Sequence, residues 1–155
     1  MLKDLFQRLR QPPGKRGRVF MLTKEKILLI DGDEGVRKSL SLFFGARNYH
    51  LHTVENAMQA LISIQKQAYD IILCDEVLPD MDGLDFFKII NNRCQETIKI
   101  LISFYGNNTT LEEVRKRGVD WLLTKPFSGD EVEAALLVLI KSKQGKNSRS
   151  PKEKC

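Results

Sequence analysis

The chain has 155 residues, of which 42% are hydrophobic and 29% are charged, and its formal net charge is +5. This length is sufficient for one substantial hydrophobic core and too short for two ordinary domains, so we expect one globular domain. No stretch approaches the roughly 18 consecutive apolar residues of a membrane span, and Met1 is not followed by the apolar segment of a secretory signal. We therefore expect a cytoplasmic protein without a membrane span.

The positive charge lies at the two ends of the chain. Residues 1–18 and residues 141–155 each contain six basic residues and one acidic residue, so the segment between them is acidic overall. Taken together, residues 11–18 and 142–155 are also rich in Pro, Gly, Ser and charged residues, which is typical of linkers and disordered segments. We interpret residues 1–24 as a basic extension or linker, residues 25–141 as the folded domain and residues 142–155 as a basic disordered tail.

The extension leaves two questions open. Its first ten residues place leucine and phenylalanine at helical spacing beside basic residues, which would suit a short amphipathic helix, although a frayed terminus is the simpler interpretation. Translation could also start at Met21, where the pattern of the folded domain begins.

Within the folded domain, five short aliphatic runs alternate with helix-like segments. The runs span residues 26–30, 49–54, 70–74, 98–103 and 120–124. Asn56 and Ser128 precede two of the helix-like segments and are suitable N-caps, the second with Glu131 three residues later. Alternating strands and helices with almost wholly apolar strands predict an α/β fold, in which helices cover both faces of one five-stranded parallel sheet.

Polar residues stand where the predicted strands end. Asp31 follows the first strand, Asp75 the third and Lys125 the fifth, while Ser103 ends the fourth. The carboxyl ends of parallel strands form one edge of the sheet, and ligands of such sheets bind in the crevice at that edge. Two carboxylates, a hydroxyl and an ammonium group gathered there predict a site for a dianionic group together with a metal ion.

Four stretches in this order and spacing resemble the receiver domain of two-component response regulators. They are ILLIDGDE, CDEVLPDMDG, ILISFYG and GVDWLLTKPF, and the resemblance extends over about residues 25–141. The resemblance implies the flavodoxin-like receiver fold with strand order 2-1-3-4-5, for which a relative in this family is a standard example.

The resemblance also implies roles for individual residues. Asp75 would accept a phosphoryl group, Ser103 would meet that group with its hydroxyl, and Lys125 would pair with it. Asp31 and Asp75 would bind Mg²⁺ together with the backbone carbonyl of Val77. A carboxylate attacks an anionic phosphoryl donor poorly unless charge is neutralised, and Mg²⁺ and Lys125 would supply that neutralisation.

Three residues depart from the family pattern. Gly32 stands where a second acidic ligand is expected, which predicts weak Mg²⁺ binding unless Asp33 or water supplies the missing oxygen. Phe104 occupies a position where a small residue is usual and is expected to narrow access for a phosphoryl donor. Leu122 stands where an aromatic side chain often changes rotamer on activation, and the neighbouring Trp121 should point to the opposite face of the strand.

The expected function is that of a stand-alone phosphoacceptor in a two-component phosphorelay. It would receive a phosphoryl group from a sensor histidine kinase or phosphotransfer protein and pass the signal to a downstream protein, and the resemblance allows a homodimer. It would not be an enzyme beyond its own phosphotransfer and dephosphorylation. The alternative is a pseudo-receiver, a protein-interaction module that does not need phosphorylation. No direct nucleic-acid binding is expected, because the chain lacks a recognition helix or aromatic platform.

One further pair of residues invites a metal interpretation. His50 and His52 are two apart in a predicted strand and so lie on one face, but the sequence supplies no third ligand nearby. We therefore expect this pair to be part of a polar surface.

Overall fold

A computed structural model of the chain describes residues 25–105 and 107–146. Its strands are β1 (Glu25–Ile30), β2 (Tyr49–Val54), β3 (Ile71–Asp75), β4 (Ile98–Phe104) and β5 (Trp121–Lys125). They form one parallel sheet in the order β2-β1-β3-β4-β5, which confirms the predicted topology. The expectations for residues 1–24 lie outside the described part of the chain.

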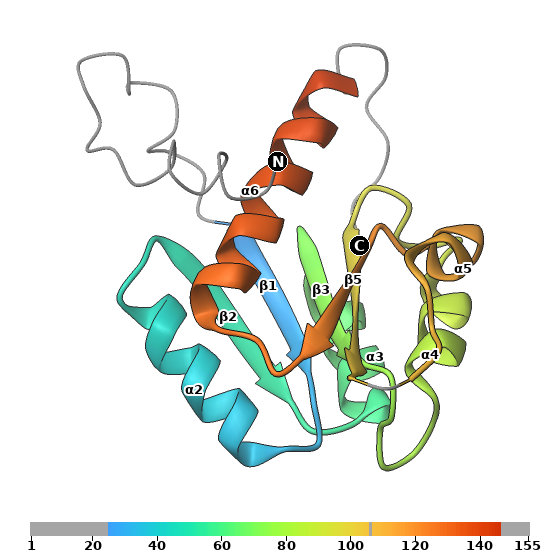
Figure 1. Cartoon of the computed structure of the whole chain (residues 1–155), viewed down its shortest axis with the longest axis horizontal. Helices are drawn as coiled ribbons and strands as arrows, with labels where there is room; N and C mark the ends of the chain where they lie inside the picture. Colours follow the sequence, from blue (N-terminus) through green and yellow to red (C-terminus); the bar gives the residue numbers. More distant parts are fainter. Residues whose placement is uncertain (1–24, 106, 147–155) are drawn as a thin grey trace.

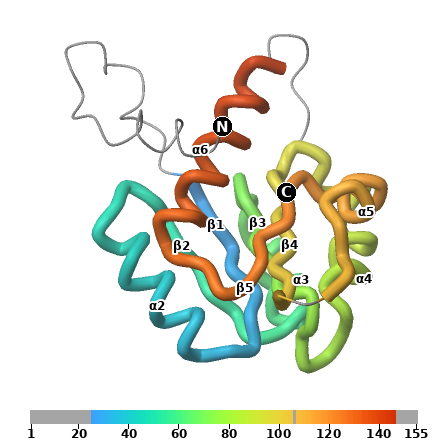
Figure 2. Tube along the Cα trace, viewed as in Figure 1, coloured from blue at the N-terminus to red at the C-terminus, as the bar shows by residue number. Residues whose placement is uncertain are grey.

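Helices lie on both faces of this sheet (Figure 1). They are α2 (Glu34–Gly45), α3 (Ala57–Lys66), α4 (Gly83–Ile90), α5 (Leu111–Lys116) and α6 (Gly129–Lys146). The trace in Figure 2 passes from strand to helix to strand along the chain, with α2 and α6 against one face and α3, α4 and α5 against the other. Among these helices, none is long and apolar enough to cross a membrane.

Each face of the sheet has its own apolar cluster. Leu28 and Ile30 of β1 pack with α3, α4 and α5, whereas Ile27 and Leu29 pack with α2 and α6. This division follows from the alternation of side chains along a strand. The same alternation separates Leu122 from Trp121, which pack against opposite clusters as expected.

The helix starts follow the predicted capping signals. Asn56 accepts a hydrogen bond from the backbone N–H of Gln59 at 2.9 Å, which caps α3. Ser128 and Glu131 form a reciprocal pair at the start of α6, because each side chain accepts a hydrogen bond from the other residue's backbone N–H.

Helix α6 continues beyond Lys141, where the sequence interpretation ended the folded domain. It extends to Lys146, and the Lys143 ammonium group donates a 2.8 Å hydrogen bond to the backbone carbonyl of Glu96. This contact ties the last turns to the loop before β4. The first residues of the expected tail are therefore helical, and the rest of the tail from residue 147 lies outside the described chain.

Candidate functional site at the carboxyl edge of the sheet

Three charged side chains, each at or directly after the end of a different strand, meet at the carboxyl edge of the sheet. The Lys125 ammonium group donates hydrogen bonds to Asp31 Oδ2 at 3.0 Å and to Asp75 Oδ2 at 2.7 Å. The two acids follow or end neighbouring strands, while Lys125 ends β5 at the sheet's edge and reaches them past β4. The structure thus brings together three of the site residues predicted from sequence.

The charges of Lys125 and Asp31 depend on each other because both side chains are largely buried. Asp31 is only 1% exposed, and burial raises its pKa although hydrogen bonds from the Asp33 backbone and from Lys125 act in the opposite direction. Burial alone would lower the pKa of Lys125, but its hydrogen bonds to Asp75 and Asp31 outweigh this effect and raise it. Lys125 therefore remains a cation and compensates the two carboxylates.

The segment between β3 and α4 holds Asp75 in place. The second carboxylate oxygen of Asp75 accepts a 3.0 Å hydrogen bond from the backbone N–H of Val77. Gly83 donates its backbone N–H to the carbonyl of Glu76 at 2.7 Å, and a Cβ atom at Gly83 would collide with the Asp75 carbonyl oxygen. Only glycine permits this close approach, which holds the backbone of residues 75–76 against the start of α4.

Gly32 is not required by the local packing or backbone. Its φ is not positive, and a Cβ atom there would meet the Pro79 ring at 3.4 Å and the Glu55 carbonyl oxygen at 3.9 Å, which are ordinary van der Waals contacts. The neighbouring Asp33 has a structural task, since its side chain caps α2 by accepting hydrogen bonds from Gly35 and Val36. The two carboxylates that bond Lys125 are thus Asp31 and Asp75.

These oxygen donors form a modest set for Mg²⁺. No cluster of three or more His, Cys, Asp or Glu side chains suited to a metal ion occurs among residues 25–105 and 107–146. Mg²⁺ is often held by one or two carboxylates with water completing its octahedral shell. Asp31, Asp75 and the Val77 carbonyl fit that pattern, with most of the shell left to water.

Ser103 lies at the same edge, but its hydroxyl bonds to a neighbour of Asp75. The side chain is 3% exposed, and Oγ donates a 2.5 Å hydrogen bond to Glu76 Oε2. Asn107 and Thr109 donate to the same carboxylate. Burial would raise the pKa of Glu76, but these three hydrogen bonds outweigh it and lower the pKa. Sequence reasoning missed Glu76, whose only signal was its place directly after Asp75.

Comparison with protein families identifies the chain at this point. The model of the response regulator receiver domain matches residues 27–137, which include Asp31, Asp75, Ser103 and Lys125. The chain belongs to this family.

Individual relatives of this receiver domain differ in how far the match extends. Sporulation initiation phosphotransferase F of Bacillus subtilis is 30% identical over 115 residues, which cover 74% of this chain and 93% of that protein. Transcriptional regulatory protein KdpE of Staphylococcus aureus is 34% identical over 116 residues, which cover 75% of this chain and 50% of that protein. The receiver thus spans nearly all of the first relative and half of the second.

Solved structures agree with the fold. The receiver domain of the Francisella response regulator 1452 has a TM-score of 0.70 and 28% identity, with 77% of this chain and 98% of that chain covered. NtrX from Brucella abortus has a TM-score of 0.75 at 23% identity, with 81% of this chain and 29% of that chain covered. At that identity, the second likeness shows the fold alone.

Phe104 stands on the rim of the receiver's site. It lines a hollow of about 420 Å³ over Asp31, Asp75 and Lys125, and it is 66% exposed. The same ring lines an adjoining cleft of about 650 Å³ together with Tyr105, Phe127 and other residues. An aromatic side chain that borders both spaces fits the expectation that Phe104 narrows the approach to Asp75.

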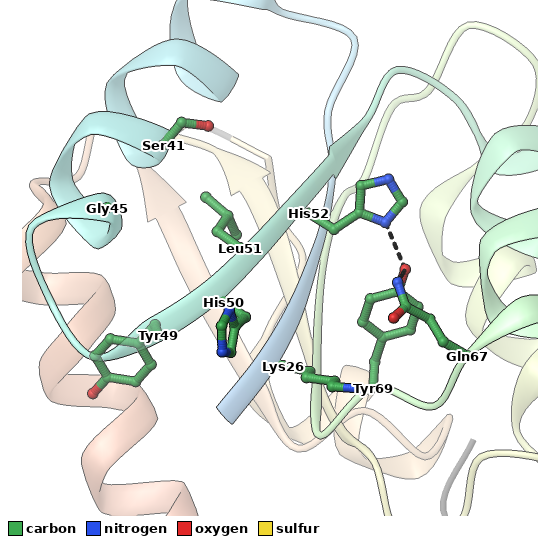
Figure 3. A pocket seen from close by; sticks show the side chains of 9 residues that line it. All are labelled: Lys26, Ser41, Gly45, Tyr49, His50, Leu51, His52, Gln67 and Tyr69. Carbon is green, nitrogen blue, oxygen red and sulfur yellow. Dashed lines mark hydrogen bonds between the residues drawn. The ribbon is translucent and has the colours of Figure 1, made fainter. Parts of the chain in front are cut away.

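A separate pocket lies beside the edge strand β2 and contains the two histidines (Figure 3). His52 Nδ1 forms a 2.5 Å hydrogen bond with the hydroxyl of Tyr69, to which Gln67 also donates. Figure 3 shows the His52 side chain turned towards Tyr69, whereas the His50 side chain points in a different direction, away from His52. The two histidines therefore do not converge on a common point.

Proposed function

We propose that this receiver domain accepts a phosphoryl group on Asp75 from a phosphohistidine of a sensor histidine kinase or phosphotransfer protein. The observation that carries the proposal is the Lys125 ammonium group held between Asp31 and Asp75 at the floor of a hollow. A carboxylate that is neutralised by a neighbouring cation and still reached from solvent combines the two properties that a phosphoryl acceptor needs.

The transfer makes one bond and breaks another. A carboxylate oxygen of Asp75 attacks phosphorus, a P–O bond forms, and the P–N bond to the donor histidine breaks. The bonding electrons remain on the imidazole nitrogen of the donor. Lys125 lies 2.7 Å from an Asp75 oxygen, so its charge lies beside the incoming phosphoryl oxygens and stabilises the charge that they bring.

Asp31, Asp75 and the Val77 carbonyl are the residues that would hold Mg²⁺, which supplies further positive charge to the phosphoryl oxygens when bound. Gly32 leaves this set one carboxylate short of the family pattern. We therefore propose that the receiver binds Mg²⁺ weakly. Lys125 then carries a larger share of the charge neutralisation.

We further propose that the domain acts as a cytoplasmic relay through protein contacts. The match to a protein named as a phosphotransferase, over 93% of that protein, supports a role that needs only the receiver domain. In this role the chain catalyses only its own phosphotransfer and dephosphorylation, and a downstream protein recognises its phosphorylated state. A homodimer is compatible with this role.

Gly32 and Phe104 favour a second candidate, a receiver that binds partners without being phosphorylated. The first weakens the cation site, and the second borders the approach to Asp75. Incubation with acetyl phosphate, with and without Mg²⁺, separates the two candidates when intact protein mass is followed over time. The phosphoacceptor predicts one phosphoryl adduct whose formation is faster with Mg²⁺. The second candidate predicts no adduct at any Mg²⁺ concentration, whether the donor is acetyl phosphate or a phosphorylated histidine phosphotransfer domain. That result would favour the receiver that binds partners without being phosphorylated.

A further inference from the structure

Glu76 joins the phosphoacceptor strand to residues 107–110, which we call the β4–α5 loop. Its carboxylate accepts hydrogen bonds from Ser103 Oγ at 2.5 Å, Asn107 Nδ2 at 2.9 Å and Thr109 Oγ1 at 2.7 Å. Ser103 ends the buried part of β4, and the other two donors come from the segment that leads to α5. The Glu76 side chain, directly after Asp75 in the sequence, therefore connects the end of β4 with the residues that precede α5.

The three hydrogen bonds should hold firmly. All three donors are neutral and the acceptor is ionised, and such charge-assisted bonds are stronger than bonds between neutral groups. Ser103 is almost completely buried, so water has little access to its hydroxyl. A hydroxyl that loses this acceptor without finding another would be an unsatisfied buried donor, which is unfavourable.

Ser103 has a single hydroxyl proton. It can donate to the Glu76 carboxylate or to a phosphoryl oxygen on Asp75, but it cannot donate to both at full strength. A phosphoryl group on Asp75 would also place about two negative charges close to the Glu76 carboxylate. These like charges would repel each other. Phosphorylation and the Glu76 hydrogen bonds thus compete for the same donor.

We propose that Glu76 is a latch that holds Ser103 and the β4–α5 loop in the unphosphorylated arrangement. This proposal rests on the proposed function. When Asp75 is phosphorylated, Ser103 transfers its hydrogen bond to the phosphoryl group and Glu76 is repelled, so Asn107 and Thr109 lose their shared acceptor and the loop is released. Through Glu76, the loss of one hydroxyl contact changes the surface of the loop, and a partner can recognise this change.

The test compares Glu76→Ala with the wild-type chain. Two measurements are made: the rate of phosphoryl uptake from acetyl phosphate with Mg²⁺, in which acetate leaves as the P–O bond to Asp75 forms, and amide hydrogen exchange of residues 107–113 without a phosphoryl donor. Removal of the latch should speed uptake about tenfold, because a charged hydrogen bond no longer has to be broken first. Exchange in the loop should also become faster.

Two further variants make the comparison specific. Glu112→Ala removes an equally charged side chain, which forms an ion pair with Lys116 on the exposed surface of α5, and should leave phosphoryl uptake unchanged. Thr109→Val keeps the Glu76–Ser103 hydrogen bond and removes one tie to the loop. It should speed loop exchange but change uptake less than Glu76→Ala does.

The possible failures give different results. Normal wild-type uptake with the same uptake rate and loop exchange in Glu76→Ala would overturn the latch and leave the proposed function standing. No uptake by either chain would overturn the proposed function and, with it, the coupling of the latch to phosphorylation. Faster loop exchange with unchanged uptake would show a structural clasp that does not oppose phosphorylation, which also overturns the latch.

Discussion

Lys125 connects the two carboxylates on which the proposed chemistry of this receiver depends. Without its ammonium group, Asp31 would be an almost fully buried acid next to a second acid, with only a backbone hydrogen bond to compensate its charge. Removing one partner of a buried ion pair is costly because the other charge is left uncompensated. Lys125 therefore stabilises the carboxyl edge of the sheet, and in the proposed function its charge would also face the phosphoryl group.

A substitution at Gly32 gives a prediction about Mg²⁺ affinity. We expect Gly32→Asp to tighten Mg²⁺ binding about tenfold, because a further carboxylate oxygen is added to the cation site. The space beside Pro79 accepts the new Cβ atom, so the variant should remain folded. Isothermal titration calorimetry with MgCl₂ measures the affinity.

Asp33→Ala is the matched control for this titration. Its side chain caps α2, so the variant should lose about 1 kcal/mol of unfolding free energy with little change in Mg²⁺ affinity. If Asp33→Ala lost Mg²⁺ binding while Gly32→Asp matched the wild type, Asp33 would be the missing ligand, and Gly32 would only have moved the acid along by one residue.

Among the secondary-structure elements, α3 is held at its N-terminus by a residue of the loop after β3. Asp80 accepts hydrogen bonds from the backbone N–H groups of Ala57 and Met58, both at 2.9 Å. A carboxylate at a helix N-terminus satisfies free backbone donors and interacts favourably with the helix dipole. The loop after β3 and the first turn of α3 are therefore held together by one side chain.

This contact predicts a pH-dependent contribution to stability. Burial would raise the pKa of Asp80, but the backbone hydrogen bonds outweigh it and hold the pKa below the ordinary value of 3.8. The contribution is therefore fully present above pH 3.8 and is lost as the pH falls through the lowered value. Because Asp80 is exposed, we expect Asp80→Ala to cost only about 0.5–1 kcal/mol at pH 6.

Urea unfolding at pH 6 and at pH 3 measures this difference. The gap between the wild type and Asp80→Ala should narrow at pH 3. Asn56→Ala is the control, since Asn56 caps the same helix with an uncharged side chain and its contribution should not depend on pH in this way. A gap for Asp80→Ala that stays constant between the two pH values would contradict a charge-dependent contact.

For the molecule as a whole, the arrangement of strands was predictable because it follows from general rules. Apolar runs alternating with helical segments require a covered parallel sheet, and the polar residues at the strand ends must then share one edge. The contacts of Glu76 were not predictable in the same way. They depend on the positions of Asn107 and Thr109, which no periodic pattern encodes. The end of α6 was also missed, because Lys143 is held by a backbone carbonyl of another loop.

The two apolar clusters lead to a prediction about the N-terminal extension. Among the described residues, those that form the two clusters lie between Ile27 and Ile140 and already cover both faces of the sheet. A chain that begins at Met21 should therefore melt within about 2 °C of the full chain when circular dichroism is followed during heating. A much larger decrease would show that residues 1–20 contribute to the stability of the domain.

Asp75 should carry the phosphoryl group, and the substitution Asp75→Asn tests this assignment. An amide nitrogen cannot form the acyl phosphate, while the variant keeps the size of the side chain. Wild-type and variant chains are incubated with a phosphorylated histidine phosphotransfer domain and Mg²⁺, and intact mass is recorded before and after mild acid treatment. We expect one acid-labile phosphoryl adduct on the wild type and none on Asp75→Asn. An acid-labile adduct of equal yield on the variant would contradict the assignment.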